Sequence, residues 1–296
     1  MKISALSEIF YFTPMAFLNF NGKILPASTP TVTADNRGLR YGDGLFETLK
    51  FRNNQIILLD EHLARLWNGL RMLKFDISRL FNPDMLEQQI NLLIKKNKLS
   101  GARIRLEVIR GDGGLYDTKS HSPIYIIQCW PLEATQDKLN ENGLRLCIYE
   151  DAKKTIDQFS SLKHNNYLPY FMGAIAAKEQ QCNDAVILNS NNNICDSTIA
   201  NIFIISQNRI ITPALSEGPI AGVMRNFVLQ QLRQNGFDVT ETTVSREMLL
   251  TADEVFLTNS IYNIRWVAEI ENRKYLNDLT RKIFAAIRQT NPDILC

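Results

Sequence analysis

A short polar stretch, Glu133–Lys138, divides the chain into two parts that each carry both strand and helix patterns. Before it, Arg103–Val108 alternates polar and apolar residues, which is typical of a half-buried strand. After it, apolar runs such as Asn201–Ile205 alternate with segments of helical spacing. The 296 residues are enough for two modest domains. We therefore predict an α+β fold, with a small N-terminal α/β domain over residues 1–132, a larger C-terminal domain over residues 133–296, and the polar stretch as linker.

The N-terminal part is expected to begin with a β-hairpin. Asn21 and Gly22 lie between two apolar runs and fit a two-residue type I′ turn, because both tolerate positive φ. Asp60 is expected to cap a helix. Apolar residues at helical spacing mark this helix and the next one: Leu63, Leu66, Leu70, Leu73, Leu86, Ile90, Leu93 and Ile94.

The same patterns predict the elements of the C-terminal part. The expected strands lie near Leu144–Tyr149, Ala185–Leu188, Asn201–Ile205 and Val255–Leu257. The expected helices lie near Leu168–Glu179, Val223–Gln234 and Leu279–Arg288. Asn189–Asn193 is rich in turn-forming residues and predicts a hairpin turn.

Charge and cysteine usage narrow the range of ligands. Lys and Arg number 33 against 31 Asp and Glu, so the net charge of +2 gives no reason to expect a nucleic acid or an anionic membrane as partner. The five cysteines are scattered without a C-x-x-C pair, which argues against a disulfide framework or a zinc site. We expect a cytoplasmic protein with a small-molecule ligand, no metal and no membrane-spanning segment.

Gly218–Gly222 leads into the helix predicted from Val223. Free N–H groups and the positive end of the helix dipole favour a phosphate at such a position. Upstream of it lies a lysine, Lys163, between a serine-containing segment and an Asn-Asn-Tyr sequence. A single lysine is far more often a surface residue than a catalytic one, so its neighbours decide its role.

Several segments occur together in one order: Asp35–Thr48, Glu61–Leu66, Lys163–Leu168, Asp196–Phe203, Gly222–Arg225 and Thr258–Ser260. In content and order they resemble the class IV, fold type IV enzymes that depend on pyridoxal 5'-phosphate (PLP). That family includes branched-chain aminotransferases, D-amino acid aminotransferases and aminodeoxychorismate lyases. The resemblance covers roughly residues 16–270, and it implies a C-terminal domain with a β-barrel-like sheet core and a homodimer.

The resemblance also implies roles for individual residues. Lys163 would form the Schiff base with PLP and carry the substrate α-proton. Tyr167 would bind the phenolic oxygen of the cofactor. Asp196 would face the pyridine nitrogen, where the family usually has the longer glutamate. The implied phosphate contacts are the amides of Val223 and Met224, the hydroxyl of Ser260 and the guanidinium of Arg65. His62 receives no catalytic role.

The substrate site has three candidates, Tyr41, Phe46 and Arg110. Arg110 ends a strand before the glycine-rich loop Gly111–Gly114, where an arginine could bind a carboxylate with two hydrogen bonds. A tight turn with no ligand explains the same loop about as well. Phe46 stands where D-amino acid aminotransferases use a tyrosine, whereas Tyr41 matches a tyrosine of the branched-chain enzymes.

The function predicted by these residues is a PLP-dependent class IV aminotransferase acting on a small amino acid, with the branched-chain type favoured. The first alternative is a 4-amino-4-deoxychorismate lyase, which releases 4-aminobenzoate and pyruvate, because the Arg110, Gly222 and Thr258 segments look more like those enzymes. The second alternative is a non-enzymatic relative that only holds PLP.

Overall fold

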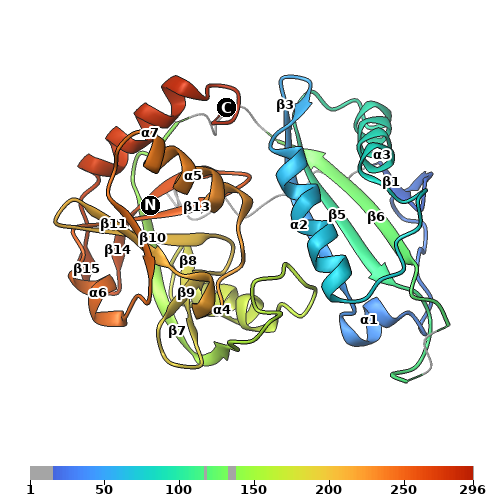
Figure 1. Ribbon diagram of the computed structural model, residues 1–296, viewed down its shortest axis with the longest axis horizontal. Coiled ribbons are helices and arrows are strands. Elements are labelled where there is room, and N and C mark those ends of the chain that lie inside the picture. The colour runs from blue at the N-terminus through green and yellow to red at the C-terminus, as the bar shows by residue number, and fades with distance from the viewer. Residues whose placement is uncertain (1–15, 117–118, 133–137, 296) are drawn as a thin grey trace, which may run out of the picture. The chain divides into compact units, whose positions relative to one another are not determined.

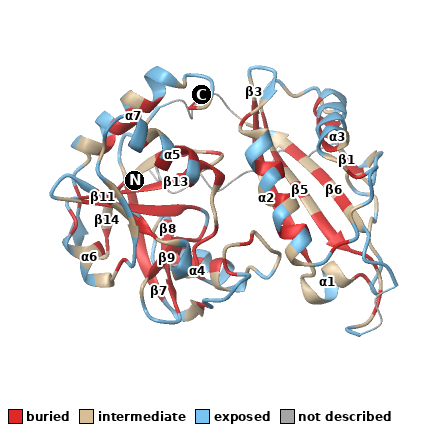
Figure 2. Ribbon diagram, viewed as in Figure 1, coloured by how far each residue is buried: buried red, intermediate tan, exposed pale blue. Residues whose placement is uncertain are grey.

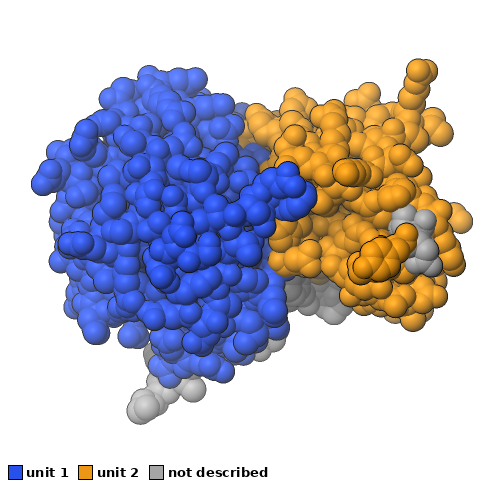
Figure 3. All heavy atoms as spheres, turned by 60° about the horizontal axis from the view of Figure 1, so that its bottom comes forward, with its two compact units in different colours: residues 1–9, 135–161, 167–296 blue, residues 10–134, 162–166 orange. Residues whose placement is uncertain are grey.

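The computed structural model describes residues 16–116, 119–132 and 138–295. The chain divides into two compact units, which Figure 3 shows in separate colours. In described residues, the N-terminal unit comprises 16–116 and 119–132 together with 162–166, and the C-terminal unit comprises 138–161 and 167–295. Most of the predicted linker, residues 133–137, lies outside the described residues.

The N-terminal unit is built on one antiparallel sheet of six strands in the order β2-β1-β6-β5-β3-β4 (Figure 1). Its strands are β1 (Phe17–Phe20), β2 (Lys23–Pro26), β3 (Gly44–Arg52), β4 (Gln55–Ile56), β5 (Ala102–Arg110) and β6 (Pro123–Pro131). Its helices are α1 (Arg37–Tyr41), α2 (Leu59–Met72) and α3 (Pro83–Lys96). The predicted hairpin at Asn21 and Gly22 is confirmed by the pairing of β1 with β2.

Helices α2 and α3 cover one face of this sheet and bury the residues predicted at helical spacing except Leu73, which is the C-cap of α2 and is partly buried. Leu63, Leu66 and Leu70 of α2 are buried in the same core as Leu86 and Ile90 of α3. Figure 2 shows this core as buried stretches on α2, β5 and β6. Burial of these side chains is the main stabilising term for the unit, at about 25 cal/mol per Å² of apolar surface.

The predicted cap of α2 is wrong by two residues. The helix begins at Leu59, and its N-cap is Leu58, which has a left-handed backbone with φ of 53° and no capping side chain. Asp60 lies inside the first turn instead. It keeps a favourable position there, because a negative charge in the first turn interacts with the positive end of the helix dipole.

The C-terminal unit is built on a nine-stranded mixed sheet in the order β12-β11-β10-β13-β14-β7-β8-β9, with β15 paired to β14. Its strands are β7 (Leu144–Lys154), β8 (Asp184–Asn189), β9 (Ile194–Ser197), β10 (Asn201–Ser206), β11 (Arg209–Pro213), β12 (Val239–Thr242), β13 (Glu254–Asn259), β14 (Asn263–Ile270) and β15 (Arg273–Lys274). β9 also contacts β10 and β11, so the sheet curls on itself as the predicted barrel-like core requires.

The helices of this unit follow the predicted pattern closely. They are α4 (Leu168–Glu179), α5 (Val223–Gln234), α6 (Arg246–Thr251) and α7 (Asp278–Thr290). α4 packs on β7 and β8, while α5 and α7 pack on β13 and on each other. Within the described part of the chain, no helix is both long and apolar enough to cross a membrane.

Residues 162–166 differ from the predicted domain division, because they group with the N-terminal unit. The backbone N–H of Phe46 donates to the Lys163 carbonyl at 2.9 Å, and that of Asn165 donates to the Gly44 carbonyl at 3.0 Å. His164 forms a β-bridge with Leu45. The segment is therefore attached to the start of β3, more than a hundred residues earlier in the sequence.

Candidate active site

The attachment of Lys163 depends on the small size of Gly44. A Cβ atom on Gly44 would lie 2.5 Å from the Val108 carbonyl oxygen and 2.9 Å from Nδ2 of Asn165. Both distances are too short for a real contact, and the first involves backbone that cannot move aside. Glycine at this position lets the segment that carries Lys163 lie directly against β3.

The Lys163 side chain lies over Phe46. Its Nζ is 4.4 Å from the centroid of the Phe46 ring, and the Cζ of Arg105 is 4.0 Å from the same centroid. Arg105 Nε donates to Glu107 at 3.1 Å, and Asn165 Nδ2 donates to the other oxygen of Glu107 at 3.0 Å. An amine and a guanidinium thus share one aromatic ring.

Arg105 is a functional candidate that sequence reasoning missed. Its strand was predicted, and the alternation already placed it on the polar face. What the sequence did not show is the register, which sets Glu107 opposite Phe46 and Arg105 opposite Thr48. Residues directly opposite one another in a sheet share a face, so Arg105 and Phe46 lie on the same side.

Arg65 is held by a buried carboxylate from β3. Its Nε and terminal nitrogen donate to the two oxygens of Glu47 at 2.8 and 2.5 Å. His62 Nδ1 contacts Glu47 at 2.6 Å, and all three side chains are largely buried. Because a carboxylate only accepts hydrogen bonds, Nδ1 of His62 carries the proton.

The charges in this cluster follow from burial and pairing. Burial alone would raise the pKa of Glu47, but the Arg65 charge and the hydrogen bonds from His62 and Arg65 outweigh it and lower the pKa to about 2. Burial lowers the pKa of His62, and the positive charges of Arg65 and Lys163 act in the same direction against the pull of Glu47. The cluster is therefore an ionised Glu47–Arg65 pair, and the neutral imidazole of His62 donates a further hydrogen bond to the carboxylate.

Asp196 is buried in the C-terminal unit and accepts three hydrogen bonds. Tyr170 Oη donates to Oδ2 at 2.8 Å, the backbone N–H of Ile220 donates to the same oxygen at 2.9 Å, and Asn201 Nδ2 donates to Oδ1 at 2.8 Å. Lys154 Nζ lies 3.6 Å from Oδ2. Burial raises the pKa of Asp196, while the Lys154 charge and these hydrogen bonds oppose the rise.

Tyr167 and Tyr170 stack beside this carboxylate. Their ring centroids are 4.4 Å apart at an interplanar angle of 24°. Tyr167 precedes α4 as its N-cap residue, and Tyr170 lies in its first turn. Sequence reasoning selected Tyr167 but missed Tyr170 and Lys154, because no local pattern places either of them beside Asp196.

The predicted anion site at the start of α5 has the expected local geometry. The N-cap of the helix is Gly222, which offers no side chain to cap the first amides, and Val223 and Met224 are the first two helical residues. A Cβ on Gly222 would lie 1.9 Å from Asn201 Oδ1. Ser260 lies in the turn directly after β13. The first N–H groups of α5 thus have no side-chain cap, an arrangement that suits an anion.

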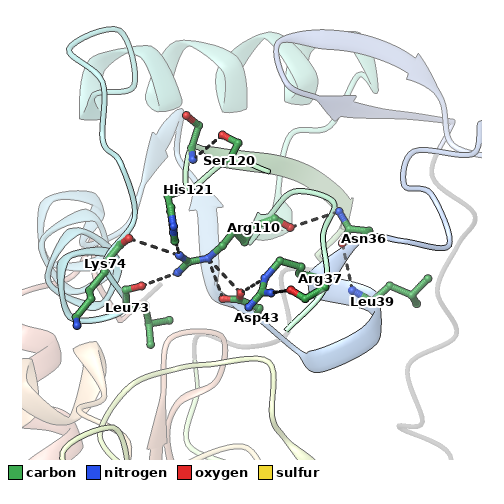
Figure 4. Close-up of polar contacts among 11 residues, drawn as sticks. Asn36, Arg37, Leu39, Asp43, Leu73, Lys74, Arg110, Ser120 and His121 are labelled. Atoms are coloured by element: carbon green, nitrogen blue, oxygen red, sulfur yellow. Dashed lines mark hydrogen bonds and ion pairs between the residues drawn. The ribbon is translucent and has the colours of Figure 1, made fainter. Parts of the chain in front are cut away.

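Arg110 is engaged within the N-terminal unit (Figure 4). Its guanidinium pairs with Asp43 at 3.1 Å, donates to the Leu73 carbonyl at 2.5 Å and contacts Nδ1 of His121. It also lies 4.4 Å from the centroid of the Phe75 ring. These contacts occupy the donors that a substrate carboxylate would need. They connect β5 to the end of α2 at Leu73 and to the loop that contains His121.

Tyr41 lies at the end of α1, between two arginines. The Cζ atoms of Arg37 and Arg40 are 5.4 and 5.3 Å from the centroid of its ring. Arg37 is paired at 2.8 Å with Asp43, the same carboxylate that pairs with Arg110.

Within residues 16–116, 119–132 and 138–295, no group of three His, Cys, Asp or Glu side chains is arranged to hold a metal ion.

The chain is similar in sequence to several named enzymes. A Methanocaldococcus jannaschii protein provisionally named a branched-chain-amino-acid aminotransferase is 29% identical over 270 residues, which are 89% of this chain and 92% of that protein. A D-alanine aminotransferase of Bacillus licheniformis is 27% identical over 260 residues, covering 86% and 88% of the two chains. An aminodeoxychorismate lyase of Vibrio harveyi is 28% identical over 244 residues, covering 81% and 87%.

The fold is similar to that of several solved structures. The structure of the Escherichia coli branched-chain amino acid aminotransferase superimposes with a TM-score of 0.84 at 22% identity, covering 95% of each chain. A branched-chain amino acid aminotransferase from T.th., complexed with N-(5'-phosphopyridoxyl)-L-glutamate, superimposes with a TM-score of 0.83 at 20% identity, covering 94% of this chain and 95% of that one. The family model for class IV amino-transferases matches residues 44–270, which include the Lys163, Arg65 and Asp196 segments. That match spans most of the chain, which therefore belongs to the class IV aminotransferase family.

Proposed function

We propose that this chain is a PLP-dependent aminotransferase that acts on a small amino acid, with the branched-chain type favoured. The observation that carries the proposal is the position of Lys163. Its carbonyl accepts a hydrogen bond from the Phe46 N–H, and the neighbouring Asn165 N–H donates to the Gly44 carbonyl. Its Nζ shares the Phe46 ring with the guanidinium of Arg105. This arrangement supplies an amine and a carboxylate-binding cation within one small region of a class IV enzyme.

The residues present fit PLP. An uncapped helix start at Gly222, with no room for a Cβ, suits a phosphate, and a buried acid at Asp196 suits a protonated ring nitrogen. We propose that Lys163 and Arg65 of the N-terminal unit hold the cofactor. The contacts that we propose from the C-terminal unit are those of Tyr167, Asp196, Val223, Met224 and Ser260.

When bound, PLP supplies an electron-withdrawing ring that stabilises the negative charge left at the substrate α-carbon after proton removal. The chain supplies the proton carrier, which we assign to Nζ of Lys163. Asp196, held by Tyr170, Asn201 and the Ile220 amide, would hold a proton on the ring nitrogen. Arg65, fixed by Glu47, would orient the phosphate and so fix the cofactor relative to Lys163.

Arg105 is our candidate for the substrate carboxylate, in place of Arg110. Among the contacts of the described residues, its guanidinium uses Nε for Glu107, and its side chain is 28% exposed. Arg110 is more deeply buried and already bound to several protein acceptors. Phe46 would form an apolar wall beside Arg105, and Tyr41 stays a candidate for the substrate side chain.

The lyase alternative is favoured by one specific observation, two arginines on the sheet face that carries Phe46. The register sets Arg103 opposite Lys50 and Arg105 opposite Thr48, so both arginines project on the face of Phe46. Lys50 lies on the same face but is fully buried, whereas the two arginines are half-buried. Aminodeoxychorismate carries two carboxylates, which suit two guanidinium groups better than a branched aliphatic side chain does.

Product analysis separates the two functions. PLP-loaded protein would be incubated in parallel with L-valine, D-alanine or enzymatically made aminodeoxychorismate, with Lys163→Ala as control. Formation of pyridoxamine phosphate and a 2-oxo acid supports the aminotransferase and gives its stereochemical preference. Release of 4-aminobenzoate and pyruvate supports the lyase instead. PLP binding without either product would contradict both activities and favour a PLP-holding relative.

We also propose that the protein is a homodimer and resides in the cytoplasm. Leu168, Phe171, Met172 and Ile175 of α4 have exposed fractions of 65%, 60%, 37% and 37%, and their spacing places them on one helix face. An apolar stripe of this kind suits a second copy of the chain. Light scattering should give a dimer for the wild type and a monomer for Phe171→Glu.

The cytoplasmic location is supported by the free thiols of Cys129, Cys147, Cys182 and Cys195, which suit a reducing compartment.

A further inference from the structure

Lys154 is a buried lysine with no role in the reaction proposed above. It is the last residue of β7, and its side chain is only 7% exposed. Its carbonyl accepts a hydrogen bond from the Ser190 N–H at 2.9 Å, so the strand end that carries it is fixed. A buried ammonium group is strongly unfavourable unless an opposite charge lies close to it.

The charge that faces Lys154 is Asp196. Nζ lies 3.6 Å from Oδ2 of Asp196 and 5.2 Å from the centroid of the Tyr170 ring. Nζ is buried, and it makes no hydrogen bond within the described part of the chain. The 3.6 Å distance is that of an ion pair without a short hydrogen bond, so the interaction acts mainly through charge.

The other groups around Asp196 also favour its ionised form, but none of them carries a compensating charge. Tyr170 from α4, Asn201 from β10 and the Ile220 amide all donate to it, but each of them is neutral. Tyr170 and Cys195 are the other titratable neighbours, and burial together with the Asp196 charge raises the pKa of both, which keeps them protonated. Lys154 is therefore the cation within the described surroundings of this carboxylate that opposes the effect of burial.

The same surroundings fix where the Asp196 carboxylate lies. Three donors at 2.8 to 2.9 Å hold the carboxylate in one orientation, and Tyr170 in turn stacks on Tyr167. A neutral Asp196 would leave a protonated ring nitrogen without an anionic partner. An ionised Asp196 stabilises the protonated ring, and that state depends on the cation beside it.

We propose that Lys154 is a positioning residue that keeps Asp196 ionised inside the protein, so that this buried aspartate can serve as the anionic partner of the PLP ring nitrogen. The second part of this inference rests on the proposed function. The first part concerns the protein without cofactor as well. The two parts can therefore be tested separately.

The cofactor-free test measures the ionisation of Asp196 by infrared spectroscopy. The carboxyl band of Asp196 is isolated as the difference between each protein and the same protein carrying Asp196→Asn. At pH 7 the wild type is expected to show the carboxylate form, and Lys154→Met the protonated form. The matched control is Lys153→Met, which removes a positive charge from the neighbouring position on the same strand. Lys154→Arg retains the charge and should restore the carboxylate.

The cofactor test uses PLP labelled with ¹⁵N in the ring. The nitrogen chemical shift is expected to report a protonated ring in the wild type and in Lys153→Met, and an unprotonated ring in Lys154→Met. The apparent Kd for PLP should rise about tenfold in Lys154→Met, the change that corresponds to one pKa unit of lost interaction. In an Asp196→Asn background, Lys154→Met should change neither the shift nor the Kd further.

The two experiments test the ionisation of Asp196 and its pairing with the ring nitrogen separately. An unchanged carboxyl band and an unchanged nitrogen shift in Lys154→Met would overturn the inference. So would an equal effect of Lys154→Met with and without Asp196. If Lys154→Met does not fold, the wild type alone still decides, because a protonated Asp196 band at pH 7 contradicts the inference. A wild type that binds no PLP but has Lys154-dependent ionisation would contradict the proposed function and support the charge pair.

Discussion

Lys163 and Phe46 are joined at two points: the Phe46 N–H donates to the Lys163 carbonyl at 2.9 Å, and Nζ of Lys163 lies 4.4 Å from the Phe46 ring centroid. The backbone contact positions the main chain of Lys163, and the ring contact positions its Nζ. Both depend on the close approach of residues 162–166 to β3. Gly44→Ala tests this close approach.

Gly44→Ala should reduce activity by at least about tenfold, because the added Cβ would lie 2.5 Å from the Val108 carbonyl oxygen of β5 and 2.9 Å from Nδ2 of Asn165 in the Lys163 segment, which would displace that segment. The measurement is kcat/KM together with the absorption of bound PLP. The matched control is Gly111→Ala, whose Cβ would meet only the flexible end of Ile124 at 3.3 Å. Equal activity of the two variants would show that Gly44 does not position the lysine.

Glu47→Gln should weaken PLP binding, because Arg65 loses its ionised partner. It should also change how stability depends on pH. The pKa of Glu47 is lowered from 4.5 to about 2, so its ionised form stabilises the fold above pH 4.5, and that stabilisation is lost as the pH falls towards 2. A shift of this size corresponds to about 3 kcal/mol.

Urea unfolding at several pH values measures this contribution. The difference in free energy of unfolding between wild type and Glu47→Gln should be about 2 kcal/mol smaller at pH 3 than at pH 7. Glu87→Gln on the exposed surface of α3 serves as control and should give a difference near zero at both pH values. A pH-independent difference for Glu47→Gln would contradict the buried ion pair.

Gly222→Ala should destabilise the protein by about 1 to 3 kcal/mol, because its Cβ would collide with Asn201 Oδ1. Asn201 also donates to Asp196 and to the Ile220 carbonyl, so the collision disturbs the buried carboxylate. In an Asn201→Ala background the same change should cost much less, since the clash is removed. Additive effects in this double-mutant cycle would place the cost elsewhere.

Arg105→Met and Arg110→Met should have opposite signatures. The first should lower kcat/KM for the amino acid by about tenfold to a hundredfold with little change in stability, as loss of a charge-assisted hydrogen bond predicts. The second should lower the free energy of unfolding by about 3 kcal/mol, because it removes a buried partner of Asp43. A stable Arg110→Met with a selective loss of substrate binding would return the carboxylate role to Arg110.

Local patterns in the sequence were sufficient for the regular elements. The helices α3, α4 and α5 are found where apolar spacing and loop residues predict them, and the Asn21-Gly22 turn joins β1 and β2. These features depend on residues close together in the chain. The cap of α2 was misplaced, because Leu58 adopts a left-handed backbone that no capping side chain signals.

Long-range pairing explains what the sequence could not show. Lys163 lies in the C-terminal half of the chain but is bound to β3, and only the backbone pairing with Gly44 and Phe46 reveals this. Arg105 and Arg110 lie on the same strand, and their different surroundings depend on the register of β5 and on the loop around His121. Lys154 meets Asp196 because β7, β8 and β9 are neighbours in the sheet.

Reductive trapping identifies the lysine that binds PLP. The PLP-loaded protein would be reduced with borohydride, digested and analysed by peptide mass spectrometry. The account predicts a pyridoxyl group on Lys163 in the wild type and none in Lys163→Ala. A pyridoxyl group on another lysine, such as Lys154, or on none at all, would contradict it.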